Sequence, residues 1–162
     1  MQKISIIGAG SWGTTLAVLL GEKGFDVKLW ARREELANEI ESKRENTQYL
    51  PGIKIPSNVI VDHSLKNVLE NVDMIIIAVP SEFFRKVVRD MNNYFDNQII
   101  VSVTKGLEFN TGKRMSQVIE DEIGKVKIAV LSGPNHAEEV STKMPTASVV
   151  ASNDKKVSKI VA

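Results

Sequence analysis

Cysteine is absent from the 162 residues of this chain. Its absence excludes a disulfide framework, a zinc site built on thiolates and a cysteine nucleophile. A chain without disulfides needs no oxidising compartment, so we expect a cytoplasmic protein. Histidine is also scarce, and the spacing of His63 and His136 matches no metal-ligand pattern. We therefore expect no metal site.

An excess of charge of one sign is also missing. Lysine and arginine together number 21 and aspartate and glutamate 20, which gives a formal net charge of +1. This balance argues against a nucleic-acid-binding protein and against a polybasic membrane anchor. Long apolar runs are missing too, because Ile4–Ile7 is too short for a signal segment and no uncharged stretch approaches the roughly 18 residues of a membrane span. We expect a soluble protein with no membrane insertion.

What the chain does contain is an alternation of short apolar segments with longer segments of helical periodicity. The apolar segments are Ile4–Ile7, Val27–Trp30, Val59–Val61, Met74–Val79, Ile99–Val103, Ile128–Leu131 and Ala147–Ala151. Several are apolar at successive positions, which is typical of strands buried on both faces. The alternation predicts an α/β fold, a Rossmann-like, doubly wound and mostly parallel sheet with helices on both faces. The length suits one such domain over residues 1–162.

The segments between the expected strands differ in character. Apolar stripes at helical spacing include Phe83, Phe84, Val87, Val88 and Met91, and also Met115, Val118, Ile119 and Ile123. The stretch Asn46–Pro56 instead holds Pro51, Gly52 and Pro56, which predicts a loop. Such a loop is either functional or a plain surface connection.

A glycine-rich turn follows the first apolar segment at once. Gly8, Gly10 and Gly13 form the pattern G-x-G-x-x-G, with Ser11 and Trp12 between the last two glycines, and a helical segment follows. This context is that of the dinucleotide-binding fingerprint. Gly8 allows the tight turn, Gly10 lets a pyrophosphate approach the backbone, and Gly13 lets the helix pack on the strand. The alternative is a glycine turn without a ligand.

Two arginines stand where the fingerprint expects a carboxylate for the ribose 2′-hydroxyl of NAD. The second apolar segment ends at Trp30, and Arg32 and Arg33 follow. A guanidinium pairs with a 2′-phosphate and stacks on adenine, so the sequence favours NADP(H), with NAD(H) as the alternative. In the competing interpretation the arginines are solvated, and Glu34 or Glu35 binds the ribose.

Polar residues also follow three later apolar segments. Ser81 is placed to cap the helix that carries Phe83. Lys105 could direct a positive charge into the cofactor crevice, although most lysines are solvated surface residues. In the segment Ser132–Val140, Pro134 suits the first turn of a helix. In the same segment, His136 with Glu138 or Glu139 could act in acid–base catalysis. A plain strand-to-helix junction with solvated carboxylates is the simpler alternative.

Taken together, these motifs resemble NAD(P)-dependent glycerol-3-phosphate dehydrogenases of the bacterial type. The resemblance covers essentially the whole chain, in order. Its motifs are Ile6–Thr14, Leu29–Arg33, Asn46–Gly52, Ala78–Ser81, Thr104–Glu108 and Ser132–Val140. The first motif is shared by many dehydrogenases. Its combination with the Tyr-Leu-Pro-Gly, Lys-Gly and Gly-Pro motifs is specific.

The resemblance implies a reaction and roles for individual residues. The reaction is reversible hydride transfer between C2 of sn-glycerol 3-phosphate and the nicotinamide C4, with dihydroxyacetone phosphate as the ketone, in the service of glycerophospholipid synthesis. By the same resemblance, cofactor contacts are Ser11, Trp12, Arg32, Arg33, Tyr49, Lys105 and Ala137. Lys105, Gly133 and Asn135 look like substrate contacts, and Lys105 supports catalysis. Family members often carry serine or threonine in place of Asn135, which leaves the hydrogen-bonding role of this amide open.

The sequence departs from the family in one respect. The family places its proton-transferring lysine in a helical second half that follows the cofactor domain, and the full-length enzyme is expected to be a homodimer. Here the last helical segment stops on apolar residues at Ala162 without a glycine or proline, which suggests a piece of a protein about twice as long. We expect this piece alone to bind NADPH without turning over substrate. Rival interpretations are the cofactor domain of another hydroxyacid dehydrogenase and a non-catalytic NAD(P)-binding regulatory module.

Overall fold

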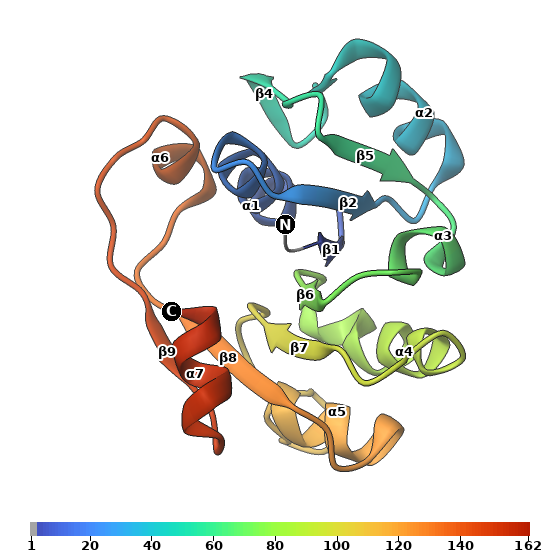
Figure 1. The fold of residues 1–162 in the computed structure, drawn as a ribbon, viewed down its shortest axis with the longest axis vertical. Coiled ribbons are helices and arrows are strands. Elements are labelled where there is room, and N and C mark those ends of the chain that lie inside the picture. The colour runs from blue at the N-terminus through green and yellow to red at the C-terminus, as the bar shows by residue number, and fades with distance from the viewer. Residues whose placement is uncertain (1–2) are drawn as a thin grey trace.

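The computed structural model describes residues 3–162 as one sheet of seven strands with helices on both faces (Figure 1). Its strands are β1 (Lys3–Ile7), β2 (Asp26–Trp30), β5 (Val59–Asp62), β6 (Met74–Ile77), β7 (Ile99–Ser102), β8 (Ile128–Ser132) and β9 (Val149–Ala151). They lie in the order β5-β2-β1-β6-β7-β8-β9. All neighbouring pairs are parallel except β8 and β9, which are antiparallel. The predicted mostly parallel, doubly wound sheet is confirmed.

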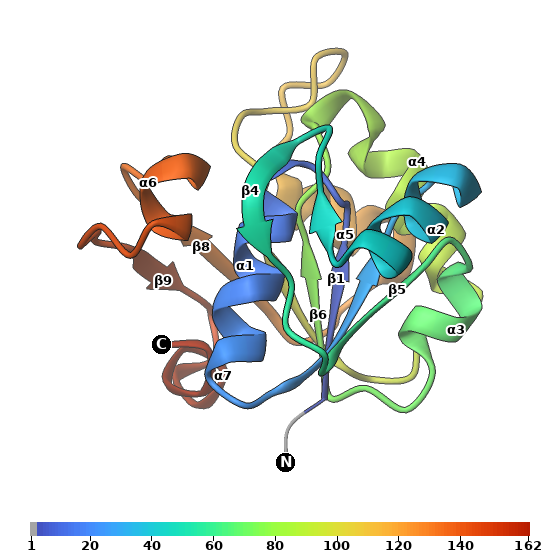
Figure 2. The same ribbon diagram turned by 90° about the horizontal axis from the view of Figure 1, so that it is seen from above.

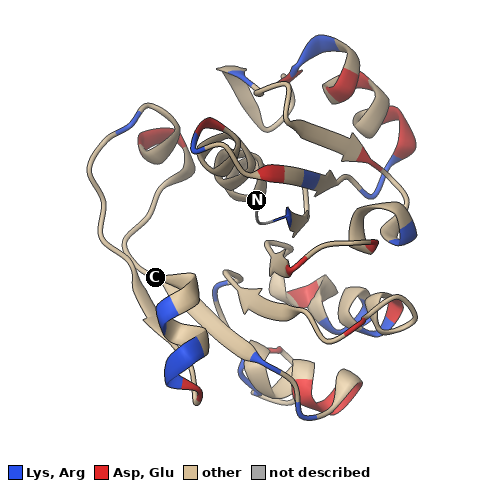
Figure 3. Cartoon of the chain, viewed as in Figure 1, with Lys and Arg blue, Asp and Glu red and all other residues tan. Residues whose placement is uncertain are grey.

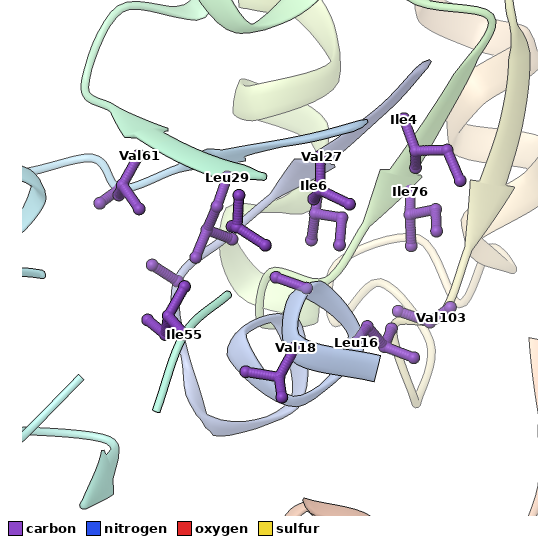
Figure 4. Packing of buried hydrophobic residues seen from close by; sticks show 14 of the residues in the cluster. Ile4, Ile6, Leu16, Val18, Val27, Leu29, Ile55, Val61, Ile76 and Val103 are labelled. Atoms are coloured by element: carbon purple, nitrogen blue, oxygen red, sulfur yellow. The ribbon is translucent and has the colours of Figure 1, made fainter. Parts of the chain in front are cut away.

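The helices divide the apolar interior into two layers. They are α1 (Ser11–Glu22), α2 (Glu34–Lys43), α3 (Leu65–Leu69), α4 (Ser81–Asn92), α5 (Met115–Ile123), α6 (Ala137–Ser141) and α7 (Lys155–Val161). One buried cluster joins the sheet to α1, α2 and α7, and part of it is drawn in Figure 4, where Leu16 and Val18 of α1 pack under Ile6 and Leu29. The other cluster joins the opposite face to α3, α4 and α5. Each strand in the middle of the sheet is therefore buried on both sides, as its continuous apolar sequence predicts.

The predicted loop at Asn46–Pro56 is wrong in part. Residues 45–54 form a hairpin of β3 (Glu45–Asn46) and β4 (Leu50–Lys54), which is separate from the main sheet. An edge strand tolerates Pro51 because no neighbour needs its missing N–H. The backbone N–H of Gly52 donates to Oε1 of Glu45 at 2.9 Å, which ties the arms together. Figure 2 shows β4 lying along α1, which it contacts.

Two expected helix starts are also wrong. The helix α4 begins at Ser81 itself, with Pro80 in the N-cap position, and the Ser81 side chain makes no cap hydrogen bond. The helix α6 begins only at Ala137, so Pro134 lies outside it, in a bend. At the end of the chain Asp154 caps α7, because its carboxylate accepts a hydrogen bond from the backbone N–H of Lys156 at 2.7 Å.

Charged residues of both signs are scattered over the helices (Figure 3). Within residues 3–162, no helix is long and apolar enough to cross a membrane. In the same part of the chain, no group of three His, Asp or Glu side chains is arranged to hold a metal ion.

Candidate dinucleotide-binding site

The glycine turn lies where β1 and β6 meet, at the carboxyl edge of the sheet. Doubly wound sheets bind ligands at such a point because the chain leaves the two strands in opposite directions. Gly8 has a φ of +119°, and a Cβ there would lie 2.7 Å from the carbonyl oxygen of Ala78. A Cβ on Gly13 would lie 1.8 Å from the carbonyl oxygen of Gly8. Close packing of the turn, the helix α1 and the end of β6 therefore requires glycine at both positions.

Gly10 differs from its two neighbours in the motif. A Cβ at this position would meet no atom of residues 3–162 within 4 Å. Its backbone is extended, with φ of −75° and ψ of −177°, which any residue adopts. Packing in the protein therefore does not explain this glycine, whereas the close approach of a ligand does. The space lies at the N-terminus of α1, where no side chain among the described residues caps the helix and its first N–H groups are free to bind an anion.

Two cavities meet at this turn. The first, of about 390 Å³, is lined by Gly10, Ser11, Trp12, Ala78, Val79, Pro80, Val103, Thr104, Lys105, Asn135, His136, Ala137 and Glu138. The second, of about 350 Å³, is lined by Gly8, Ala9, Gly10, Trp30, Ala31, Arg32, Arg33, Leu36, Tyr49, Ala78, Val79, Pro80, Phe83, Lys86, Val87 and Asp90. They share Gly10, Ala78, Val79 and Pro80. Together they form one groove across the carboxyl edge of the sheet, with the glycine turn at its middle.

Arg32 and Arg33 lie at the same end of the groove. The guanidinium of Arg32 stands 5.4 Å from the ring centre of Phe83, a cation–π distance, and Nη2 of Arg33 donates to Oε1 of Gln48 at 2.5 Å. Within residues 3–162 neither arginine forms an ion pair, so both charges remain available to an anion. Glu34 and Glu35, the alternative ribose ligands, are on the first turn of α2 and do not line the groove.

Lys105 marks the opposite end of the groove. It follows β7, and its Nζ donates to the backbone oxygen of Asn135 at 3.1 Å. The Asn135 side chain is buried, and both of its N–H groups are used inside the fold. They donate to Oγ1 of Thr146 at 2.7 Å and to the carbonyl oxygen of Ala147 at 3.1 Å. Asn135 therefore fixes Lys105 through its backbone and the chain before β9 through its side chain.

Gly133 and Ala137 lie on either side of Asn135. A Cβ on Gly133 would stand 2.3 Å from the carbonyl oxygen of Ala147, so packing alone requires this glycine. Gly133 lines a neighbouring cavity, of about 390 Å³, that also reaches Lys105. Ala137 is buried in the groove wall, and its carbonyl oxygen accepts a hydrogen bond from Oγ1 of Thr15 on α1 at 3.2 Å. The groove thus brings together the sequence-predicted cofactor residues except Gly13, which packs against the turn, and Gly133 lies just beyond it.

The structure also separates residues that the sequence pattern treats alike. Phe84 is fully buried, whereas Phe83 of the same apolar stripe is 42% exposed and lines the groove. Both tryptophans line the groove, Trp12 in the first cavity and Trp30 in the second. Trp30 is also buried in the core, and its Nε1 donates to the carbonyl oxygen of His63 at 2.7 Å.

Sequence reasoning also missed Asn46 of β3, whose buried side chain contacts the glycine turn. The only sequence signal was its place at the start of the hairpin motif.

The loop that carries Lys105 is held by charges. Arg85 on α4 donates to both oxygens of Glu108, and a further hydrogen bond reaches Glu108 from Thr111. These contacts lower the pKa of Glu108 from 4.5 to about 2, with the Arg85 hydrogen bonds as the largest cause. Arg85 also bonds Asp121 and Glu122 of α5, and all three carboxylates raise its own pKa. The loop is thus fixed to two helices.

Comparison with known proteins places this groove in a family. The profile of the family described as NAD-dependent glycerol-3-phosphate dehydrogenase N-terminus matches residues 3–158. A glycerol-3-phosphate dehydrogenase [NAD(P)+] of Chlorobium phaeobacteroides is 47% identical over 158 residues, which are 94% of this chain and 47% of that protein. The corresponding protein of Clostridium tetani is 43% identical, over 98% of this chain and 46% of its own length.

A solved structure agrees with the sequence comparisons. The crystal structure of glycerol-3-phosphate dehydrogenase from Coxiella burnetii superposes with a TM-score of 0.94 at 38% identity, over 99% of this chain and 49% of that one. The chain therefore spans about half the length of the curated relatives it matches. It belongs to the NAD-dependent glycerol-3-phosphate dehydrogenase family, of which it carries the N-terminal, nicotinamide-cofactor region.

Proposed function

We propose that this chain is the cofactor-binding half of an enzyme that interconverts sn-glycerol 3-phosphate and dihydroxyacetone phosphate by hydride transfer. The observation that carries the proposal is the groove itself. It has at one end two arginines that form no ion pair within residues 3–162, a glycine turn open to a ligand in the middle and Lys105 at the other end. Its relatives named glycerol-3-phosphate dehydrogenase [NAD(P)+] support the choice of substrate.

The groove fits an extended dinucleotide. The free space at Gly10 and the first N–H groups of α1, from Ser11 and Trp12 onward, suit a pyrophosphate. Arg32, Arg33 and Tyr49 surround the adenosine end, where unpaired guanidinium groups favour a 2′-phosphate, and we therefore propose NADP(H) as the preferred cofactor, with NAD(H) also accepted. Ala137 lies in the wall at the nicotinamide end. The cofactor, when bound, supplies the hydride.

The chain's own contribution to the chemistry centres on Lys105. Its Nζ is held at the nicotinamide end of the groove by the backbone of Asn135, so its charge is fixed before substrate arrives. A fixed positive charge stabilises the negative charge that develops on the C2 oxygen of the substrate. We place the substrate against Lys105, Gly133 and Asn135. Because both amide N–H groups of Asn135 are already used, its contribution is to hold Lys105 and the groove wall.

The remaining half of the full-length protein, on this proposal, supplies the proton-transferring lysine and closes over the substrate phosphate. The complete enzyme would act as a cytoplasmic homodimer and supply the backbone of glycerophospholipids. The test compares this chain with the full-length protein in an assay of NADPH oxidation by dihydroxyacetone phosphate. Turnover by the full-length protein and NADPH binding without turnover by this chain are expected. Full-length activity with a keto acid and none with dihydroxyacetone phosphate, or activity with neither, contradicts the proposal.

A further inference from the structure

Asn46, the last residue of β3, is fully buried (0% exposed), and its side chain faces the glycine turn. Its Nδ2 donates to the carbonyl oxygen of Ala9 at 2.9 Å and to Oγ1 of Thr14 at 2.8 Å. Its Oδ1 accepts from the backbone N–H of Tyr49 at 3.2 Å. Both N–H groups of the amide are therefore used, and their partners are 37 and 32 residues away along the chain. Through these hydrogen bonds the Asn46 side chain fixes the position of the β3–β4 hairpin relative to the glycine turn and the start of α1.

The bond to Ala9 acts on the backbone of the glycine turn. The Ala9 carbonyl belongs to the same planar peptide unit as the N–H of Gly10, and in a trans peptide these two groups point in opposite directions. No cis peptide bond occurs in residues 3–162. Holding the Ala9 oxygen on the Asn46 side therefore sets the direction of the Gly10 N–H on the other side. The hydrogen bond from Asn46 therefore restrains the Ala9–Gly10 peptide.

The bond to Tyr49 acts on the adenosine end of the groove. Tyr49 lines that end, and the neighbouring Gln48 accepts the hydrogen bond from Arg33. The segment from Asn46 to Tyr49 is therefore anchored to the glycine turn at one end and reaches the arginine site at the other. Figure 2 shows the hairpin lying along α1, the helix that the turn opens.

We propose that Asn46 is a positioning residue for dinucleotide binding, which orients the Ala9–Gly10 peptide toward the pyrophosphate and fixes the hairpin that carries Tyr49. The inference rests on the proposed function as far as the ligand is concerned. Asn46 lines neither cavity of the groove and touches no ligand itself. Its effect passes through the backbone of two segments that do line it.

The substitution Asn46→Asp tests this role, because it keeps the size of the side chain and replaces the two N–H donors by an oxygen. The Thr14 hydroxyl can turn to donate to the new carboxylate, but the Ala9 carbonyl cannot, and two oxygens then face each other. We expect the affinity of this chain for NADP⁺, measured by calorimetric titration at neutral pH, to fall roughly tenfold relative to the unsubstituted chain. Equal affinities would overturn the proposal.

Lower pH tests whether the loss of affinity depends on the ionised form of the new carboxyl group. Burial raises the pKa of the new carboxyl group, and its protonated form again donates to the Ala9 oxygen. The affinity of Asn46→Asp relative to the unsubstituted chain should therefore recover as the pH falls. Glu45 precedes Asn46 on β3, and Glu39 of α2 accepts a hydrogen bond from Thr47; both have lowered pKa values, chiefly through the Gly52 N–H and Lys43 respectively. Titration of the nucleotide and of all other groups is common to both proteins and cancels in the ratio.

Asn58→Asp is the matched control. Asn58 likewise donates from Nδ2 to two carbonyl oxygens, of Gly21 at 2.9 Å and Phe25 at 2.8 Å, but it lies at the far end of α1 and lines neither cavity. We expect it to lower the urea midpoint of unfolding without changing NADP⁺ affinity. Equal losses of affinity in the two variants would mean that Asn46 acts only on overall stability, and would overturn the proposal.

A variant that introduces no charge separates the loss of the hydrogen bonds from the effect of a buried carboxylate. Asn46→Ala removes all three hydrogen bonds, and we expect it to lose a similar factor in affinity that does not recover at low pH. Recovery in this variant too would contradict the proposed role of the Ala9 contact. No dihydroxyacetone phosphate enters these measurements, so the role of Asn46 can fail while the turnover assay succeeds, and the reverse.

Discussion

Arg85 on α4 joins Glu108 by two parallel hydrogen bonds, from Nε to Oε1 at 2.7 Å and from Nη2 to Oε2 at 2.8 Å. The Glu108 side chain is largely buried, so the pair is better shielded from solvent than most surface ion pairs. Glu108 lies three positions after Lys105 in the same loop. The geometry of the loop that presents Lys105 therefore depends on an ionised carboxylate.

The ion pair predicts how stability depends on pH. The pKa of Glu108 falls from 4.5 to about 2 on folding, so its ionised form stabilises the folded chain fully above about pH 4.5, and this contribution is lost as the pH falls toward 2. In urea unfolding at a series of pH values, Glu108→Gln should be less stable than the unsubstituted chain above pH 4.5, and the difference should vanish near pH 2. Glu120→Gln, at an exposed α5 glutamate without an ion pair among residues 3–162, is the control. A difference that persists at pH 2 would contradict the assignment.

The glycine turn predicts opposite outcomes for two substitutions of the same kind. Gly13→Ala should destabilise the fold by more than about 4 kcal/mol, because its Cβ would lie 1.8 Å from a backbone oxygen. Gly10→Ala should cost less than about 1 kcal/mol, since its Cβ meets nothing. In Gly10→Ala the added methyl group occupies the space left for the pyrophosphate, so NADP⁺ affinity should fall about 10- to 100-fold. Thermal unfolding and calorimetric titration measure the two effects, and full NADP⁺ affinity in a folded Gly10→Ala would refute the assigned role of this glycine.

The main sheet could be predicted because its strands are buried on both faces. A run such as Met74–Ile77 has no polar alternative, and the glycine turn after β1 fixes where the first crossover begins. The short elements could not be predicted in this way. The helix α3 is one turn long, too short for helical periodicity to appear, and β3 has two residues whose pairing with β4 depends on contacts outside the segment.

The residues of the candidate site likewise fall into those that the sequence predicts and those that only the fold reveals. Gly10, Arg32 and Lys105 are recognisable from their positions after predicted strands, because parallel strands bring their carboxyl ends to one edge. Phe83 and Phe84 are adjacent, and helical spacing assigns both to the core, whereas only the position of α4 relative to β2 leaves Phe83 beside Arg32. The role of Asn46 depends on hydrogen bonds to partners more than 30 residues away, which no local pattern contains.

The arginine end of the groove predicts the choice of cofactor. Replacing Arg32 and Arg33 together by alanine should weaken NADPH binding about 100-fold, because two charge-assisted contacts to the 2′-phosphate are lost. NADH, which lacks that phosphate, should be affected only about threefold through lost stacking on adenine. The double substitution of Lys155 and Lys156 by alanine on α7 removes the same charge away from the groove, and both affinities should remain. Equal losses for NADPH and NADH in the arginine variant would refute 2′-phosphate recognition.

Lys105 predicts a separation of catalysis from stability. The Lys105 residue is exposed, and its Nζ donates one hydrogen bond to the Asn135 backbone oxygen. Lys105→Met should therefore change the free energy of unfolding by less than about 0.5 kcal/mol. In the full-length protein the same substitution should lower kcat/KM for dihydroxyacetone phosphate by a factor of about 100 or more, because the fixed charge that stabilises the developing oxyanion is gone. Lys125→Met, at an exposed lysine outside the groove, should leave kcat/KM unchanged. A near-normal kcat/KM in Lys105→Met would identify Lys105 as an ordinary surface lysine and leave the positive charge at this end of the groove without a catalytic role.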